Sequence, residues 1–118
     1  MTENEMKQRT KSFALRALKL VDALPEKRAV RILAMQLRRS ATSVGANYRA
    51  ACRSRSTVKM ISKLSVVEEK ADESAFWLEL LGEHGLVKAA ELTPLAKEAD
   101  ELTAIMVASV KTLRTRSG

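Results

Sequence analysis

Apolar residues recur at three- and four-residue steps through most of the chain, a period typical of amphipathic helices. The first helix is predicted over residues 5–24. Pro25 should end it, because the residue before a proline is disfavoured in the helical conformation. The second helix is predicted over residues 26–53, although Gly45 lies inside it at a cost of about 1 kcal/mol relative to alanine. Small residues around Gly45 would let another helix pack closely against this one.

Boundary signals also frame the second half of the chain. The third helix is predicted over residues 56–83, after serines that can cap its first N–H groups and before Gly85, a natural residue just past a helix end. The fourth helix is predicted over residues 94–114, with Thr93 as its N-cap and Pro94 at the first helical position. Since the connections are short, consecutive helices should pack antiparallel as an up-down four-helix bundle.

Length and composition agree with an all-α class. A chain of 118 residues predicts one domain, residues 1–118. Its 4 glycines and 2 prolines are too few for a turn-rich sandwich or barrel. The longest apolar run, residues 104–108, falls far short of the roughly 20 residues that a membrane span requires. With an acidic start, no secretory signal and a single cysteine, the protein is expected in the cytoplasm, without a membrane partner.

The positive charge is concentrated in the first half of the chain. The net charge is +7, and residues 1–55 hold 13 Lys and Arg against 4 Asp and Glu. Residues 56–118 hold 8 against 10. A basic half of this kind suits a polyanion such as nucleic acid. The alternative is that the basic half meets the acidic half, within one chain or between copies.

The second helix carries six arginines on one side. At about 100° per residue, they share roughly one quarter of the helix surface, opposite the apolar side chains. Arginine suits planar, bidentate contact with phosphate or carboxylate, and like charges so close together need an anionic partner. The candidate nucleic-acid-binding residues are therefore Arg28, Arg31, Arg38, Arg39, Arg49 and Arg53. The alternatives are a solvated face, or pairing in the same or an adjacent subunit with an acidic edge of the third helix, Glu68, Asp72 and Glu79.

A neutral polar strip separates these arginines from the apolar side of the second helix. It consists of Gln36, Ser40, Ser43 and Asn47. Such a strip is often a partly buried hydrogen-bonding seam.

The end of the third helix is apolar on every side. From residue 75 to residue 81, six of seven residues are apolar, and a helix that is apolar all round must be covered all round. A bundle of this size is too small to bury every face of one helix. Self-association is therefore predicted through the candidate interface residues Phe76, Trp77, Leu80 and Leu81. The alternative is that the loop over residues 86–93 covers them.

The chain has no motif for catalysis, cofactor binding or metal binding. His84 is the only histidine, and it falls in the last turn of a helix, where a cation is favoured without any catalytic role. Cys52 falls at the edge of the apolar side, as a small core residue would. No Gly-rich phosphate loop, zinc motif or Ser/His/Asp set occurs. The sequence thus predicts a non-enzymatic protein without cofactors, and its few aromatic residues favour electrostatic nucleic-acid binding over base stacking.

Two blocks of sequence resemble a bacterial family. The first is QLRRSATSVGANYR, residues 36–49. The second is FWLELL, residues 76–81, preceded by Lys63-Leu64 and by ADES over residues 71–74. Together they span most of the second and third helices. Their pattern is similar to that of the 23S rRNA-intervening-sequence protein family, also called the four helix bundle protein family.

The resemblance implies an up-down four-helix bundle that assembles into a homo-oligomeric ring, typically a homopentamer. Some members are encoded inside intervening sequences of 23S rRNA genes. A more distant relative, the accessory variability determinant of diversity-generating retroelements, is a basic pentameric barrel that binds nucleic acid and a reverse transcriptase. The resemblance therefore implies self-association, RNA or DNA as a partner and, for a retroelement-linked member, a reverse transcriptase.

The sequence departs from the family pattern in two places. Ala50 stands where a glutamate usually follows the Asn-Tyr-Arg stretch, and Glu69-Lys70 reverses a Lys-Glu pair. If those acids hold arginines within the family, some arginines of this chain are freer to bind external anions. The sequence predicts a non-enzymatic, self-associating basic bundle that binds nucleic acid through its second helix. The alternative is a structural assembly whose charged faces serve subunit contacts alone.

Overall fold

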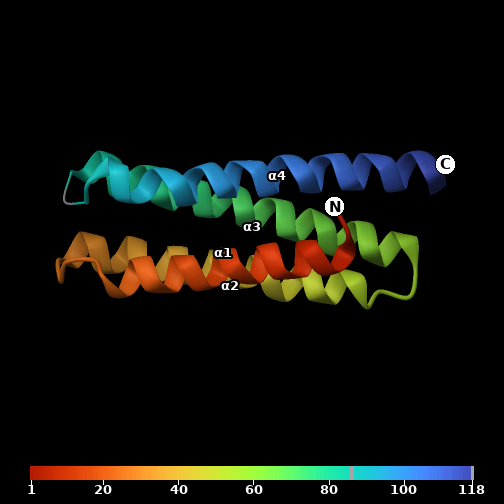
Figure 1. The fold of residues 1–118 in the computed structure, drawn as a ribbon, viewed down its shortest axis with the longest axis horizontal. Helices are drawn as coiled ribbons and strands as arrows, with labels where there is room; N and C mark the ends of the chain where they lie inside the picture. Colours follow the sequence, from red (N-terminus) through yellow and green to blue (C-terminus); the bar gives the residue numbers. More distant parts are fainter. Residues whose placement is uncertain (86, 118) are drawn as a thin grey trace.

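The structure, a computed structural model, describes residues 1–85 and 87–117, and that part of the chain forms four α-helices. Consecutive helices run in opposite directions along an elongated bundle of 48 × 22 × 20 Å (Figure 1). The prediction of an all-α chain with four helices is confirmed. The helices are α1 (Glu3–Asp22), α2 (Arg28–Cys52), α3 (Thr57–His84) and α4 (Ala89–Ser117).

Local signals set the start of α1 and both ends of α3. The Thr2 hydroxyl accepts a 3.1 Å hydrogen bond from the Glu5 N–H, and the Glu5 carboxylate accepts one of 3.2 Å from the Thr2 N–H. This capping box begins α1 two residues before its predicted start. Ser56 caps α3 in the same manner, by accepting a 3.2 Å bond from the Lys59 N–H. Gly85 ends α3 in the left-handed conformation at φ 86°, as its position in the sequence predicted.

The predicted start of the fourth helix was wrong. α4 begins at Ala89, five residues early, and Pro94 lies inside it. A proline there leaves one carbonyl of the first turn without its helical N–H donor, which is unfavourable. Burial offsets the cost, because Leu92 in this extra turn lies in the core of the bundle. The tertiary contacts of this extra turn outweigh the local start signal.

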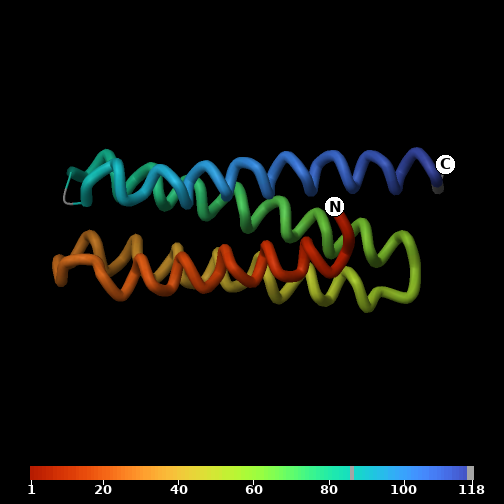
Figure 2. Tube along the Cα trace, viewed as in Figure 1, coloured from red at the N-terminus to blue at the C-terminus, as the bar shows by residue number. Residues whose placement is uncertain are grey.

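The helices pack chiefly on their neighbours in sequence. α2 lies between α1 and α3, and α3 lies between α2 and α4, whereas α1 and α4 meet over a short stretch only. Figure 2 shows that α4 continues past the start of α1. Where α1 and α4 meet, Arg9 donates hydrogen bonds of 2.7 and 2.6 Å to Glu98 and one of 2.7 Å to Glu101. Within residues 1–85 and 87–117, these are the only ion pairs that join two helices.

The core of the bundle is mostly aliphatic and contains a small hydrogen-bonded seam. Its largest fully buried side chains include Phe13, Leu37, Leu78 and Leu102. The predicted neutral strip of α2 faces α3, where the buried hydroxyls of Ser40 and Ser74 share a 2.8 Å hydrogen bond. None of the helices in the described residues is both long and apolar enough to cross a membrane.

Candidate nucleic-acid interface

The structure leaves all six predicted arginines exposed, five of them on α2 and the sixth, Arg53, as the C-cap residue directly after it. The apolar residues of the same helix point the opposite way into the core, among them Val30, Leu37 and Val44. Arg31 lies 3.6 Å from Glu26, and both side chains are exposed, so this pair contributes little. Within the described residues, none of the other five arginines forms an ion pair.

The acidic edge predicted on α3 does not neutralise these arginines within one protomer. Glu68, Asp72 and Glu79 form no ion pair in the part of the chain that the structure describes. The predicted pairing therefore does not occur in the same subunit. The arginines of α2 remain available to a partner outside the protomer.

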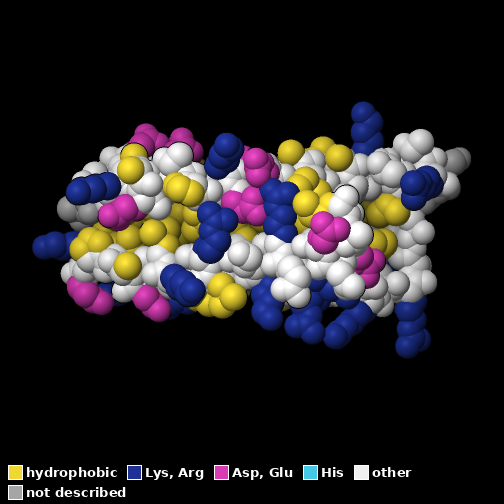
Figure 3. All heavy atoms as spheres, viewed as in Figure 1, with side chains coloured by type: hydrophobic (Ala, Val, Ile, Leu, Met, Phe, Trp, Pro, Cys, Tyr) yellow, Lys and Arg dark blue, Asp and Glu magenta, His cyan; other side chains and the backbone are white. Residues whose placement is uncertain are grey.

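Two of the six arginines line a groove between α1 and α2. The groove has a volume of about 510 Å³ and is lined by Arg49 of α2, by Arg53 directly after α2, and by Lys7 and Lys11 of α1. None of its lining residues is acidic. We call this surface the basic groove. Figure 3 shows Lys and Arg side chains along the lower edge of the molecule, over the second half of α2.

The floor of the basic groove consists of small residues. Gly45 lies so close to α1 that a Cβ atom added to it would be 3.4 Å from the carbonyl oxygen of Thr10. The close helix packing predicted around Gly45 is therefore confirmed. Ala14 and Ala46 line the same floor. Because these side chains are short, a ligand can approach the backbone of both helices between the four cationic side chains.

The other predicted arginines lie outside the basic groove. Arg31 and Arg38 line a smaller recess of about 110 Å³ at the start of α2, together with Glu26. Arg39 lines a separate recess on the α3 side, which it shares with Lys70 and Glu73. The six arginines share one side of a helix, but the structure divides them. Arg49 and Arg53 face α1, whereas Arg31, Arg38 and Arg39 line recesses that also contain an acidic side chain.

Sequence reasoning missed Lys7 and Lys11 as members of this site. The two lysines are four residues apart, so they lie on the same side of α1, a signal that is visible in the sequence. Lys7 lies 3.9 Å from the exposed carboxylate of Glu3. Nothing in the sequence, however, indicates that this side of α1 borders Arg49 and Arg53. That neighbourhood depends on how α1 packs against α2.

The apolar segment of α3 is divided between the core and the surface. Leu81 is fully buried inside the protomer, so its assignment to an oligomer interface was wrong. Leu80 is half-buried. Phe76 is 49% exposed, and its ring centroid lies 5.1 Å from that of the half-buried Trp77. The Trp77 indole N–H donates a 3.3 Å hydrogen bond to Glu73. Three of the four predicted interface residues therefore keep surface for a partner.

A second groove, between α3 and α4, was not predicted. It has a volume of about 400 Å³ and is lined by the carboxylates of Glu79, Glu83 and Asp100 over apolar side chains that include Leu78 and Leu92. No lining residue is basic. We call this surface the acidic groove. In the described residues, none of its three carboxylates forms an ion pair.

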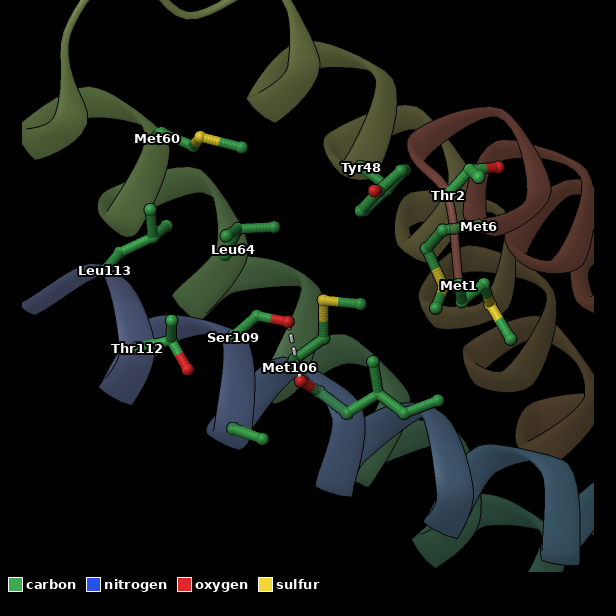
Figure 4. Close-up of a pocket in the computed structure, with 12 residues that line it drawn as sticks. Met1, Thr2, Met6, Tyr48, Met60, Leu64, Met106, Ser109, Thr112 and Leu113 are labelled. Carbon is green, nitrogen blue, oxygen red and sulfur yellow. Dashed lines mark hydrogen bonds between the residues drawn. The ribbon is translucent and has the colours of Figure 1, made fainter. Parts of the chain in front are cut away.

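An apolar pocket of about 460 Å³ lies where the start of α1 meets the end of α4. Figure 4 shows Met1 and Met6 from the N-terminal region facing Met60 and Leu64 of α3 and Met106 of α4. Thioethers and aliphatic groups dominate its lining, and they neither donate nor accept protons near neutral pH.

The remaining candidate chemical groups lie in unreactive surroundings. Burial raises the pKa of the Cys52 thiol, which therefore stays protonated and weakly nucleophilic near neutral pH. Burial also raises the pKa of Tyr48, whose side chain hydrogen-bonds with Cys52. His84 is exposed in the last turn of α3, as predicted. Across residues 1–85 and 87–117, no group of three His, Cys, Asp or Glu side chains is arranged to hold a metal ion.

Comparison with known proteins connects this geometry to one family. A solved crystal structure of a protein of unknown function from the S23 ribosomal protein family of Bacteroides thetaiotaomicron has the same fold, with a TM-score of 0.86. The two sequences are 28% identical over 94% of this chain and 99% of the other. A search of curated proteins gives no match. The sequence profile of the 23S rRNA-intervening sequence protein family matches residues 2–108. The chain belongs to the 23S rRNA-intervening sequence protein family.

Proposed function

We propose that this protein is a non-enzymatic bundle that binds the phosphate backbone of RNA or DNA in its basic groove. The observation that carries the proposal is the groove itself, in which Lys7, Lys11, Arg49 and Arg53 converge. No lining residue is acidic, and among the described residues only Lys7 of the four has an ion-pair partner, the exposed Glu3 at 3.9 Å. Four cations so close together repel one another, and a polyanion relieves that repulsion. Phosphate contacts of this kind position a nucleic acid without reading its sequence.

The composition of the groove favours a backbone ligand over unpaired bases. No aromatic side chain lines it, so stacking, the usual means of holding single strands, has no platform there. The family takes its name from intervening sequences of 23S rRNA, which makes structured RNA a natural first ligand to test. We therefore expect duplex RNA and duplex DNA to bind with similar affinity and little sequence preference.

We further propose that the protein acts as a homo-oligomer, with a ring such as a pentamer as its expected form. The exposed pair of Phe76 and Trp77 on α3 supports self-association, because adjacent large aromatic side chains on a surface are typical of interfaces. In a ring, copies of the basic groove repeat around an axis and their potentials add. The alternative function, a structural assembly without nucleic acid, rests on the same aromatic pair.

The decisive experiment compares two charge reversals of equal size. Arg49→Glu with Arg53→Glu alters the basic groove, whereas Lys88→Glu with Lys97→Glu alters exposed lysines outside it. Binding of unrelated RNA and DNA duplexes is measured by filter retention at about 50 mM salt, where phosphate contacts are strong. We expect the groove variant to bind about 100-fold more weakly and the control to change by less than about threefold.

Circular dichroism and a melting curve establish that both variants are folded. If the wild type retains no duplex at about 50 mM salt, the nucleic-acid function is excluded and the structural alternative stands. If the groove variant and the control lose duplex affinity equally, net charge rather than the groove determines binding.

A further inference from the structure

The acidic groove has a carboxylate at each end and an apolar floor between them. Gly82 and Leu92 face each other across it, since a Cβ on Gly82 would be 3.4 Å from Leu92 Cδ1. Eight residues further along the antiparallel α4, Asp100 lies level with the start of the groove at Ala75. Glu83 lies at the opposite end, about 12 Å away along the helix axis. A ligand that fits this groove has cations about that far apart and apolar groups between them.

The first half of α2 presents such a pattern on its exposed side. At spacings of four, three and four residues, the side chains on one stripe are Arg28, Ile32, Met35 and Arg39. At about 100° per residue, all four fall within roughly 60° of one another. Ile32 is 57% exposed and Met35 is 51% exposed, although both are large and apolar. The two arginines are about 16 Å apart along the helix axis, and their long side chains can reach inward.

Two charges on these surfaces lie at unfavourable ends of their own helices. Arg28 is the first residue of α2, where the helix dipole disfavours a cation, and the N-cap residue Lys27 makes no side-chain capping bond. Glu83 is in the last turn of α3, where the dipole disfavours an anion. Neither charge has an ion-pair partner among the described residues. If the two surfaces came together, each of these charges would gain an oppositely charged partner.

We propose that the α2 stripe of one copy docks in the acidic groove of a second copy of this chain. The contact is a helix in a groove, with Ile32 and Met35 over the apolar floor and an arginine at each acidic end. It is continuous with the aromatic surface of α3, because Phe76 lies on the exposed side of α3, within two turns of Glu79 and Glu83. This inference goes beyond nucleic-acid binding and assigns a partner to a surface that the basic groove does not use.

The geometry makes the association head to tail. The stripe and the acidic groove are different surfaces of one protomer, so each copy can offer one to a neighbour and receive the other, and the contacts form either a ring or a chain. The division of α2 follows from this arrangement. Its first half contacts another protomer, whereas Arg49 in its second half and Arg53 directly after it remain open to nucleic acid.

Charge exchange tests the contact directly. Arg28→Glu with Arg39→Glu, or Glu83→Arg with Asp100→Arg, places like charges on both sides of the contact. Sedimentation velocity should show that each double variant shifts from the wild-type assembly toward the 13.0 kDa monomer, with association weakened at least about 10-fold. The chain carrying all four substitutions, and an equimolar mixture of the two double variants, should both regain the assembly, because complementary charges meet again.

A matched control distinguishes this proposal from the nucleic-acid function. Arg49→Glu with Arg53→Glu makes the same charge change at the end of the same helix, outside the stripe, and should leave the assembly intact while duplex binding is lost. A monomeric wild type, or a four-substitution chain that stays monomeric although its melting curve is that of a folded bundle, would overturn the docking proposal. Neither outcome bears on binding of duplex RNA or DNA to the basic groove.

Discussion

The basic groove and the acidic groove are built alike and carry opposite charge. Each lies between two antiparallel helices, α1 with α2 and α3 with α4, which form the two layers of the bundle in Figure 1. Each has a glycine at its floor, Gly45 in one and Gly82 in the other. Yet neither groove neutralises the other: among the described residues the basic groove has one ion pair, between Lys7 and Glu3, and the acidic groove has none. Most charges of the two grooves therefore have no ion-pair partner among the described residues of one protomer, and the core of the bundle is apolar.

The largest expected effect concerns the salt dependence of the basic groove. If its four cations each contact a phosphate, the slope of log affinity against log salt is about −4, and binding weakens roughly 100-fold between 50 and 200 mM salt. Lys7→Gln with Lys11→Gln should reduce the magnitude of that slope by about 2. Glu79→Gln with Glu83→Gln in the acidic groove should leave it unchanged. A slope near zero for the wild type would contradict a phosphate ligand.

The next effect concerns the glycine at the floor of the basic groove. Because α1 lies against Gly45, the side chain of Gly45→Leu would have to push the Thr10 backbone away. Overpacking of this kind costs about 2 kcal/mol, and thermal melting should show a drop of several degrees. Gly45→Ala serves as the control, since its Cβ would make an ordinary contact at 3.4 Å. A leucine variant that melts with the wild type would show that α1 and α2 are further apart.

A smaller effect is expected at Arg9, which links the two layers through Glu98 and Glu101. Arg9→Met keeps the aliphatic stem and removes the ion pairs, so we expect a loss of about 1–2 kcal/mol in unfolding free energy at pH 7. The Arg9 guanidinium lowers the pKa of Glu98 below its ordinary value of 4.5. The stabilisation is therefore fully present above pH 4.5 and is lost as the pH falls through the lowered pKa.

Denaturant titrations of the wild type and Arg9→Met at several pH values check this link. The difference in unfolding free energy between the two proteins should be constant near neutral pH and should decrease at acidic pH. A difference that is the same at pH 3 and pH 7 would indicate that Arg9 acts through packing alone.

The smallest expected effect is a gain at the glycine of the acidic groove. Gly82 lies within α3, and a Cβ there would meet only the end of the Leu92 side chain, at 3.4 Å. Gly82→Ala should stabilise the bundle by about 0.5–1 kcal/mol, because alanine loses less conformational freedom in a helix. Thermal melting measures the gain. If Gly82→Ala instead destabilises the bundle, the Leu92 side chain cannot move away, and the helices pack as closely at Gly82 as at Gly45.

Much of the fold is determined by residues that are close together in the sequence. The spacing of apolar residues predicts the four helices, and Ser56 and Gly85 set the ends of α3 through interactions within a few residues. The arginine side of α2 follows from helical geometry alone, because about 100° per residue fixes which side chains share a face. These features can be predicted without knowing which helices pack against each other.

The tertiary structure decided the features that depend on neighbouring helices. Burial of Leu92 favours a start of α4 ahead of Pro94, and burial of Leu81 removes it from the surface although its segment is apolar on every side. The basic groove exists because α1 brings two lysines beside α2, and the acidic groove exists because α4 brings Asp100 beside α3. The sequence by itself determined which charges share a face of one helix. Which faces meet depends on how the apolar surfaces of all four helices pack into one core, and this packing is not encoded in any single segment.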